Sequence, residues 1–172
     1  MKPDRIRQLK SRKYHSAELG FGTPGIAELR ETDMARVKLN LPDSYEFSTE
    51  ISVRIGDINY GGHLGNDAVL SLIHEARMRF FKARGFPDEK HVAGAAIILS
   101  DAVIVYKSEG FHGDVLVIEL ARSDYNRHGF DIIYKITNKA DGKEIARVKT
   151  GIVFFDYDRK KVIRIPETFR SS

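Results

Sequence analysis

Side chains that could take part in chemistry are concentrated in residues 57–66. This stretch holds a carboxylate, two side-chain amides and an imidazole, which belong to Asp57, Asn59, Asn66 and His63. It joins a segment with the pattern of a strand to one with the pattern of a helix, and the first amides of a helix are unpaired hydrogen-bond donors. We therefore expect these polar groups to meet a ligand at a strand-to-helix turn.

Three of these residues have two interpretations each. Asp57 is a candidate general base, or it forms the turn by accepting backbone amides at the end of the strand. Asn59 contacts a substrate, or it bonds the backbone of its own loop. His63 acts as a base or a hydrogen-bond donor, or it braces the loop.

The start of the helix is interpreted more simply. Asn66 is expected to be the N-cap, with substrate contact as the alternative, and Asp67 suits the positive end of the helix dipole. We expect Gly61 or Gly62 to adopt a positive φ, or to let a substrate approach the backbone closely.

A polar row runs along the predicted helix, because Asp67, Ser71, Glu75 and Arg79 are spaced four residues apart. This row is either a solvated face with a Glu75–Arg79 ion pair, or it faces the site of a partner subunit. In the second case Glu75 is a further catalytic candidate.

Hydrophobic periodicity predicts the elements that position these groups. The helix is expected to start near Asn66 and to end near Arg84, with Gly85 stopping it. Its apolar face is formed by Val69, Leu72, Ile73, Ala76 and Phe80, and widened by Leu70, Met78 and Phe81. So wide an apolar arc predicts a helix that is largely enclosed by other structure.

Alternating hydrophobic residues predict strands over residues 46–55, 96–107, 114–122, 129–137 and 144–155. The connections between the later strands are short, which is typical of antiparallel neighbours. One helix against one antiparallel sheet is an α+β arrangement. We expect about five strands in a curved sheet that wraps the helix.

Composition limits the class of protein. A chain of 172 residues suits one domain, here residues 36–172, preceded by a basic arm over residues 1–35. Residues 1–13 contain six basic residues and one acidic residue, which leaves 22 basic against 23 acidic residues elsewhere. The positive charge therefore belongs to the arm, and nucleic-acid binding by the domain is not expected.

Other features bear on location. There is no cysteine, no apolar run long enough to span a membrane and no hydrophobic signal segment. We expect a cytoplasmic protein. The six histidines show no metal-binding spacing, so neither a metal nor another cofactor is expected.

The element order and the motif together resemble the hotdog fold, and within it the 4-hydroxybenzoyl-CoA thioesterase-like family. That family's motif runs approximately Asp-x-Asp-x-x-Gly-His-x-x-Asn, followed by a helix that carries Glu-Ala-Arg. The matching residues here are Asp57, Gly62, His63, Asn66, Glu75, Ala76 and Arg77. The resemblance covers about residues 45–158.

The resemblance implies hydrolysis of acyl-CoA or acyl-carrier-protein thioesters, in a homodimer or a dimer-based tetramer with sites at the subunit interface. It implies that backbone amides at the helix start stabilise the oxyanion. The substrate contacts implied in this chain are Tyr60, Gly62, Leu64, Gly65 and Asn66.

One departure from the motif affects the mechanism. The second Asp is the usual catalytic carboxylate of the family, and this chain has Asn59 there. A neutral amide cannot act as a general base, so another group must activate water. Asp57 is the nearest candidate, because an extended segment would send it to the same side as Asn59. Glu75 and His63 are the others.

The missing carboxylate keeps two alternatives open. The protein is a non-catalytic module that binds acyl thioesters, or it is a hotdog dehydratase of 3-hydroxyacyl thioesters. A dehydratase needs a histidine and a carboxylate that face each other, which His63 and Glu75 could supply across a dimer.

Overall fold

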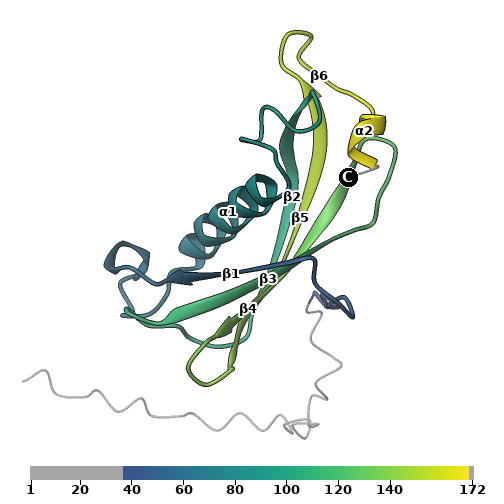
Figure 1. Cartoon of the computed structure of the whole chain (residues 1–172). Coiled ribbons are helices and arrows are strands. Elements are labelled where there is room, and N and C mark those ends of the chain that lie inside the picture. Colours follow the sequence, from purple (N-terminus) through teal and green to yellow (C-terminus); the bar gives the residue numbers. More distant parts are fainter. Residues whose placement is uncertain (1–36, 171–172) are drawn as a thin grey trace, which may run out of the picture. The chain divides into compact units, whose positions relative to one another are not determined.

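The computed structural model describes residues 37–170, in which one long helix lies along one face of an antiparallel sheet (Figure 1). The elements are β1 (Phe47–Ser52), the 3-10 turn η2 (Ile55–Asp57), α1 (Asn66–Ala83), β2 (Ala96–Tyr106), β3 (Val115–Ser123), β4 (Gly129–Asn138), β5 (Glu144–Asp156), β6 (Lys161–Val162) and α2 (Glu167–Arg170). The α+β prediction is confirmed. The expected arm, residues 1–35, lies outside the described residues.

The sheet has the strand order β1-β3-β4-β5-β2, and the short β6 pairs with β5. Every neighbouring pair is antiparallel, as the short connections predict. The last four predicted strands are found within one or two residues of their expected ends. In β5, alternate residues from Ala146 to Phe154 are fully buried, because the pleat sends them all to one face.

The helix prediction is confirmed in its position and in the face that it buries. Five residues expected on its apolar face are at most 2% exposed: Val69, Leu72, Ile73, Ala76 and Phe80. They pack against the inner face of the sheet, which curves around the helix (Figure 1). Leu70, by contrast, remains 41% exposed and Met78 is half-buried. Within residues 37–170, the sheet therefore encloses the helix from one side.

The predicted first strand is longer than the observed one. β1 ends at Ser52, and residues 55–57 coil into η2. The Asp57 carboxylate causes this turn by accepting the backbone amide of Arg54 at 2.8 Å. Because the backbone coils here, Asp57 and Asn59 do not lie on the same side of an extended segment, which corrects that expectation.

A buried polar layer lies between α1 and the sheet. Arg77 is 3% exposed, and its Nε donates to Glu89 Oε1 at 2.6 Å. The hydroxyls of Tyr134 and Thr150 are 3.2 Å apart in the core. Burial raises the pKa of Tyr134 despite the lowering effect of Arg77, so its hydroxyl stays neutral.

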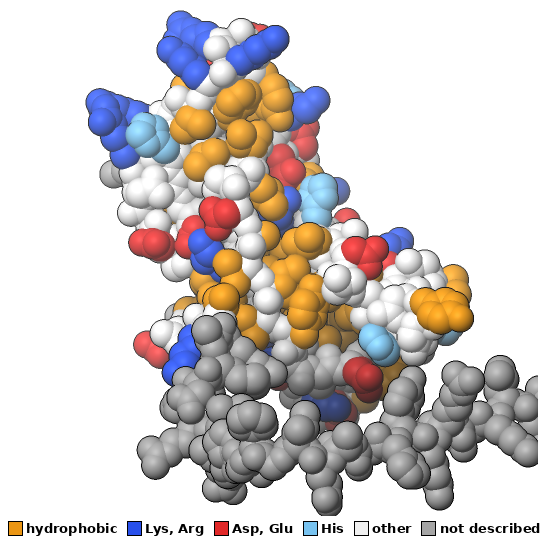
Figure 2. Space-filling view, turned by 180° about the vertical axis from the view of Figure 1, so that it is seen from behind, with side chains coloured by type: hydrophobic (Ala, Val, Ile, Leu, Met, Phe, Trp, Pro, Cys, Tyr) orange, Lys and Arg blue, Asp and Glu red, His pale blue; other side chains and the backbone are white. Residues whose placement is uncertain are grey.

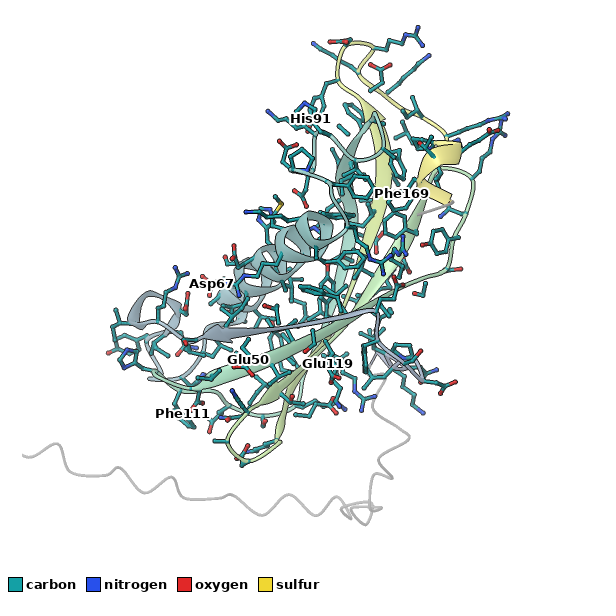
Figure 3. The ribbon with its side chains drawn as sticks, in the orientation of Figure 1. Glu50, Asp67, His91, Phe111, Glu119 and Phe169 are labelled. Atoms are coloured by element: carbon teal, nitrogen blue, oxygen red, sulfur yellow. The ribbon has the colours of Figure 1, made fainter. Side chains whose placement is uncertain are left out.

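The C-terminal segment closes the core at the far end of the helix. Phe169 of α2 packs with its ring centroid 5.1 Å from those of both Phe130 and Phe154 (Figure 3). It is 1% exposed. The final residues described therefore belong to the domain's core.

Among residues 37–170, strand β2 pairs only with β5 and is therefore an edge of the sheet. Leu99 on this strand is 42% exposed and borders a groove that also contains Leu70 and His74 of α1. Uncovered hydrophobic side chains also interrupt the charged surface on the face shown in Figure 2. Between residues 37 and 170, no helix combines the length and apolarity that a membrane span requires.

Candidate functional site

A pocket of about 340 Å³ opens beside the N-terminal end of α1. Its lining comes from the turn before α1 and from the segment that follows β2. The lining residues are Asn59, His63, Leu64, Asn66, Tyr106, Lys107, Ser108 and Glu109. The structure thus brings together four of the residues predicted from sequence.

The turn that carries Asn59 and His63 is closed by backbone hydrogen bonds. The Asn59 amide donates to the His63 carbonyl at 2.9 Å, and the Gly62 amide donates to the Asn59 carbonyl at 3.0 Å. Gly62 has a φ of +83°, a conformation in which a side chain would be strained. The expectation of a positive φ at Gly61 or Gly62 is therefore confirmed at Gly62.

Asn59 braces this turn through its side chain. Its Oδ1 accepts the Gly61 amide at 2.8 Å, and its Nδ2 lies 3.3 Å from Nδ1 of His63. A side-chain NH₂ only donates and needs an unprotonated Nδ1, whereas the Leu64 carbonyl, 3.4 Å from the same nitrogen, only accepts and needs a protonated one. The imidazole also lies against Gly61, where a Cβ atom would come within 2.9 Å of Nε2. Both side chains thus have bracing contacts as well as positions in the pocket.

The start of the helix differs from the expectation in its capping. Gly65 is the N-cap, with φ −65° and ψ 144°, and Asn66 is the first helical residue. No side chain caps this end. Asn66 is therefore not the N-cap, because the chain already turns into the helix one residue earlier.

The backbone amides at the helix start differ in whether they already have a hydrogen-bond acceptor. The Leu64 amide donates to the Gly110 carbonyl and the Gly65 amide to the Asp57 carbonyl, both at 2.8 Å. In the described part of the chain, the Asn66 amide has no hydrogen-bond partner. Of the three amides expected to serve a substrate carbonyl, that of Asn66 is thus the free one.

Tyr106 joins the end of β2 to the helix start. Its hydroxyl donates to the Asn66 carbonyl at 3.0 Å. Burial and the negative charge of Asp67 raise the pKa of Tyr106. The hydroxyl therefore remains a neutral donor that fixes the first turn of α1 against the sheet.

The carboxylate of Asp57 does not line the pocket. It is 6% exposed and accepts the Arg54 backbone amide, while Arg54 Nε lies 3.3 Å from it. Burial works to raise the pKa of Asp57, but these hydrogen bonds and the charge of Arg54 outweigh it, and the pKa is lowered. Asp57 is thus an ionised residue that holds η2.

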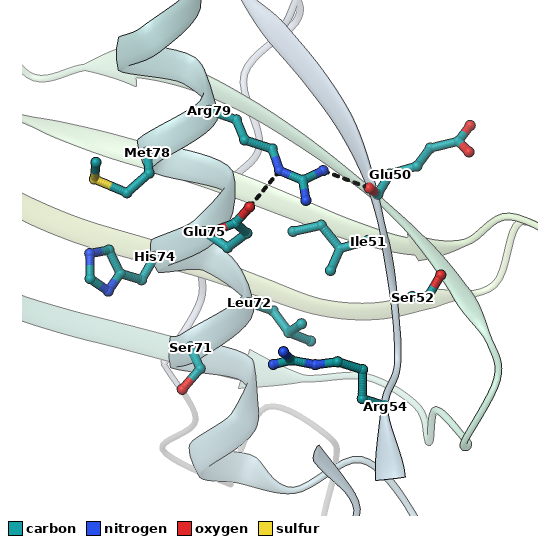
Figure 4. A pocket seen from close by; sticks show the side chains of 10 residues that line it. All are labelled: Glu50, Ile51, Ser52, Arg54, Ser71, Leu72, His74, Glu75, Met78 and Arg79. Atoms are coloured by element: carbon teal, nitrogen blue, oxygen red, sulfur yellow. Dashed lines mark hydrogen bonds and ion pairs between the residues drawn. The ribbon is translucent and has the colours of Figure 1, made fainter. Parts of the chain in front are cut away.

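Glu75 and Tyr60 also lie outside the pocket. Glu75 lines a different groove of about 580 Å³ between α1 and β1, where it accepts Arg79 Nε at 2.7 Å (Figure 4). The sequence-based alternative of a Glu75–Arg79 ion pair is therefore found. Tyr60 is fully exposed, at 110%. No group of three or more potential metal ligands is found among residues 37–170.

The sequence and fold were compared with those of known proteins. A family model described as the thioesterase-like superfamily matches residues 53–172, well over half of the chain. The chain belongs to the thioesterase-like superfamily. A search of curated proteins found no match.

Solved structures similar to this thioesterase-like chain include three with thioesterase titles. A 1,4-dihydroxy-2-naphthoyl-CoA thioesterase from Synechocystis has 22% identity and a TM-score of 0.66, over 73% of this chain and 93% of that one. A Thermus thermophilus thioesterase complexed with coenzyme A and Zn has 21% identity and a TM-score of 0.65, over 74% and 97%. A probable thioesterase from Escherichia coli has 20% identity and a TM-score of 0.59, over 72% and 93%.

These likenesses confirm the hotdog fold expected from the motif and the strand order. In this thioesterase-like chain, sequence reasoning missed the contribution of the end of β2 and the segment after it, namely Tyr106, Lys107, Ser108 and Glu109. No local pattern in that segment indicates a site. Two hydrogen bonds bring it to the helix start, one from the Leu64 amide to the Gly110 carbonyl and one from the Tyr106 hydroxyl to the Asn66 carbonyl.

Proposed function

We propose that this protein hydrolyses an acyl thioester whose thiol is coenzyme A or the prosthetic thiol of an acyl-carrier protein. The observation that carries the proposal is the unpaired Asn66 amide at the wall of the pocket. It stands at the positive end of an 18-residue helix. A hydrogen-bond donor so placed suits the oxygen of a carbonyl that becomes negatively charged during attack.

The reaction needs one water and releases one acid and one thiol. Water attacks the thioester carbonyl carbon, and the oxyanion that forms accepts the Asn66 amide. Collapse of this intermediate breaks the carbon–sulfur bond, and the thiolate takes up the proton that the water has lost. His63 and Asn59 border the reacting carbon from the turn, where they orient the carbonyl or the water.

The identity of the carrier is supported by similarity and by charge. Two of the similar proteins are described by their titles as a CoA thioesterase and as a thioesterase complexed with coenzyme A. Lys107 adds a positive charge to the pocket lining, which suits an anionic phosphopantetheine carrier. Both thiols contain this phosphopantetheine arm, so a substrate panel must separate them.

We also propose that the protein acts as a homodimer, or as a tetramer built from such dimers. Within residues 37–170, β2 leaves one row of backbone groups unpaired, and exposed sheet edges favour pairing with another chain. Leu70 and Leu99 add uncovered apolar surface beside this edge. A second copy of the chain, with its β2 antiparallel to the β2 of the first copy, would cover both the unpaired edge and this apolar surface.

A second candidate function is binding of an acyl thioester without hydrolysis. It is favoured by Asn59, whose neutral side chain stands where the family has its usual carboxylate and is used to brace the turn. In that case the pocket would hold the thioester carbonyl without activating water.

The test is an assay of free thiol released from a panel of acyl-CoA and acyl-carrier-protein thioesters, from short aliphatic to aromatic acyl groups. We expect saturable turnover with at least one member. If no member is hydrolysed but calorimetry detects tight binding, the binding module is the better description. If the panel is neither hydrolysed nor bound, both functions are excluded.

A further inference from the structure

One carboxylate in the pocket has no structural partner. Glu109 lines the pocket together with Asn59, His63 and Asn66. Its side chain is exposed and makes no hydrogen bond or ion pair with any residue between 37 and 170. A charged group that is not used in packing or pairing is available to act on a ligand.

The backbone on both sides of Glu109 is held in place. On one side, the Gly110 carbonyl accepts the Leu64 amide at 2.8 Å. On the other side, the Ser108 hydroxyl donates to the Glu144 carbonyl at 2.5 Å. The Glu109 side chain therefore projects from a backbone whose neighbouring residues are anchored on both sides.

This anchoring also relates Glu109 to the free amide. Gly110 is buried, and its Cα faces Leu64 so closely that a Cβ atom there would lie 3.5 Å from the Leu64 Cβ. Leu64 precedes Asn66 by two residues. The carboxylate and the oxyanion donor thus belong to two segments that are directly hydrogen-bonded, and both line the same pocket.

The other carboxylates considered for water activation are engaged elsewhere. Asp57 is buried against Arg54 and does not line the pocket. Glu75 is paired with Arg79 in the groove between α1 and β1. Among the residues that line the pocket, Glu109 is the one with a carboxylate.

We propose that Glu109 is the general base that activates water in place of the carboxylate missing at position 59. The inference rests on the proposed thioester hydrolysis. The Glu109 carboxylate removes a proton from water as the water oxygen bonds to the carbonyl carbon. When the carbon–sulfur bond breaks, the protonated Glu109 returns that proton to the departing thiolate, so the enzyme is regenerated.

The test compares Glu109→Gln, Glu109→Asp and Glu109→Ala with the wild-type protein on a thioester that the wild type hydrolyses. Glu119→Gln is the matched control, since Glu119 lies on β3, pairs with Lys135 and does not line the pocket. We expect Glu109→Gln to lower kcat by about 10²- to 10⁴-fold with a small change in KM, as is usual for loss of a general base. Circular dichroism and the melting temperature should be unchanged.

A chemical rescue separates catalysis from an indirect structural effect. Added formate should restore part of the turnover of Glu109→Ala, because a small carboxylate can occupy the vacated space, and it should not increase wild-type turnover. Glu109→Asp should keep more activity than Glu109→Gln.

The outcomes distinguish the role of Glu109 from the thioester hydrolysis on which it rests. A wild type that hydrolyses the substrate, with Glu109→Gln within about threefold of it, overturns the role of Glu109 and leaves thioester hydrolysis standing. A wild type that hydrolyses no member of the panel overturns the proposed function and the inference with it.

Discussion

The side-chain oxygen of Asn59 accepts the backbone amide of Gly61 at 2.8 Å, which makes Asn59 part of the turn itself. The same side chain donates toward His63 through Nδ2. A carboxylate could accept the Gly61 amide in the same way, but it could not donate to the imidazole. An amide and a carboxylate at position 59 would therefore meet the imidazole differently.

This relationship predicts the behaviour of two variants of Asn59. Asn59→Asp should keep the bond to the Gly61 amide, retain the melting temperature within a few degrees, and leave kcat unchanged or lower. Asn59→Ala should lose that bond and about 1 kcal/mol of unfolding free energy. Thiol-release kinetics and urea unfolding are the measurements. A gain in hydrolysis of more than about tenfold in Asn59→Asp would favour the binding module over an active enzyme.

The buried pair of Arg77 and Glu89 predicts a strong and non-additive effect on stability. Arg77→Ala removes the arginine partner of the Glu89 carboxylate, which keeps the contact of its Oε2 with His74 Nε2 at 3.4 Å. We expect a loss of about 3 kcal/mol, since breaking a buried pair costs ~3–5 kcal/mol and Glu89 retains some solvent contact. Arg77→Met combined with Glu89→Gln should recover part of this loss. Urea unfolding of the single and double variants measures the interaction energy between the two side chains. Losses of unfolding free energy that add strictly would contradict the prediction.

The interactions of Glu46 are expected to raise the free energy of unfolding by an amount that is lost in acid. Burial works to raise its pKa, but hydrogen bonds from the Arg122 side chain and amide, with the charges of Arg122 and Arg84, lower it below its ordinary value of 4.5. A group whose pKa is lower in the folded state stabilises the fold above its unfolded pKa, and the contribution is lost as the pH falls.

Glu46→Gln should therefore be less stable than the wild type at neutral pH, and the difference should shrink once the pH falls below 4.5. Unfolding free energies measured from pH 7 down to the acid limit of the fold test this. A difference that stays constant over the whole range would show that the ionisation of Glu46 is not involved.

The uncovered edge of the sheet predicts the effect of one surface charge. Leu99→Lys should shift the protein from a dimer toward a monomer, because it places a charge beside the edge that the second copy would cover. Val162→Lys on β6 is the control, since Val162 is similarly exposed, at 46%. Sedimentation equilibrium gives the mass of each variant. A wild type that is monomeric at all concentrations would rule out the dimer.

The long elements could be predicted from the sequence because their signals are local. Val69, Leu72 and Phe80 repeat with the helical period, and the residues of β5 alternate with the period of a strand. The Gly-His-x-x-Asn spacing places His63 and Asn66 at the turn into the helix, so the family and the fold could be predicted from the sequence. In each case residues within about twenty positions determine the outcome.

Two features could not be obtained this way: one is a local side-chain contact, and the other depends on a distant part of the chain. The strand-like pattern before Asp57 gives no indication of η2, which forms because a side chain turns back onto the Arg54 amide. The availability of the amides at the helix start also depends on the Gly110 carbonyl, more than forty residues further along the chain.

By itself, the sequence determined the helix, the strands and the motif that joins them, since propensity, periodicity and turn chemistry act between near neighbours. The tertiary structure alone decided which groups of that motif face the pocket. It pairs the Leu64 amide with the Gly110 carbonyl, leaves the Asn66 amide without a partner among residues 37–170 and brings Glu109 into the same pocket. The physical reason is that the antiparallel return of the chain after β2 sets these contacts, and no local pattern encodes where that return will lie.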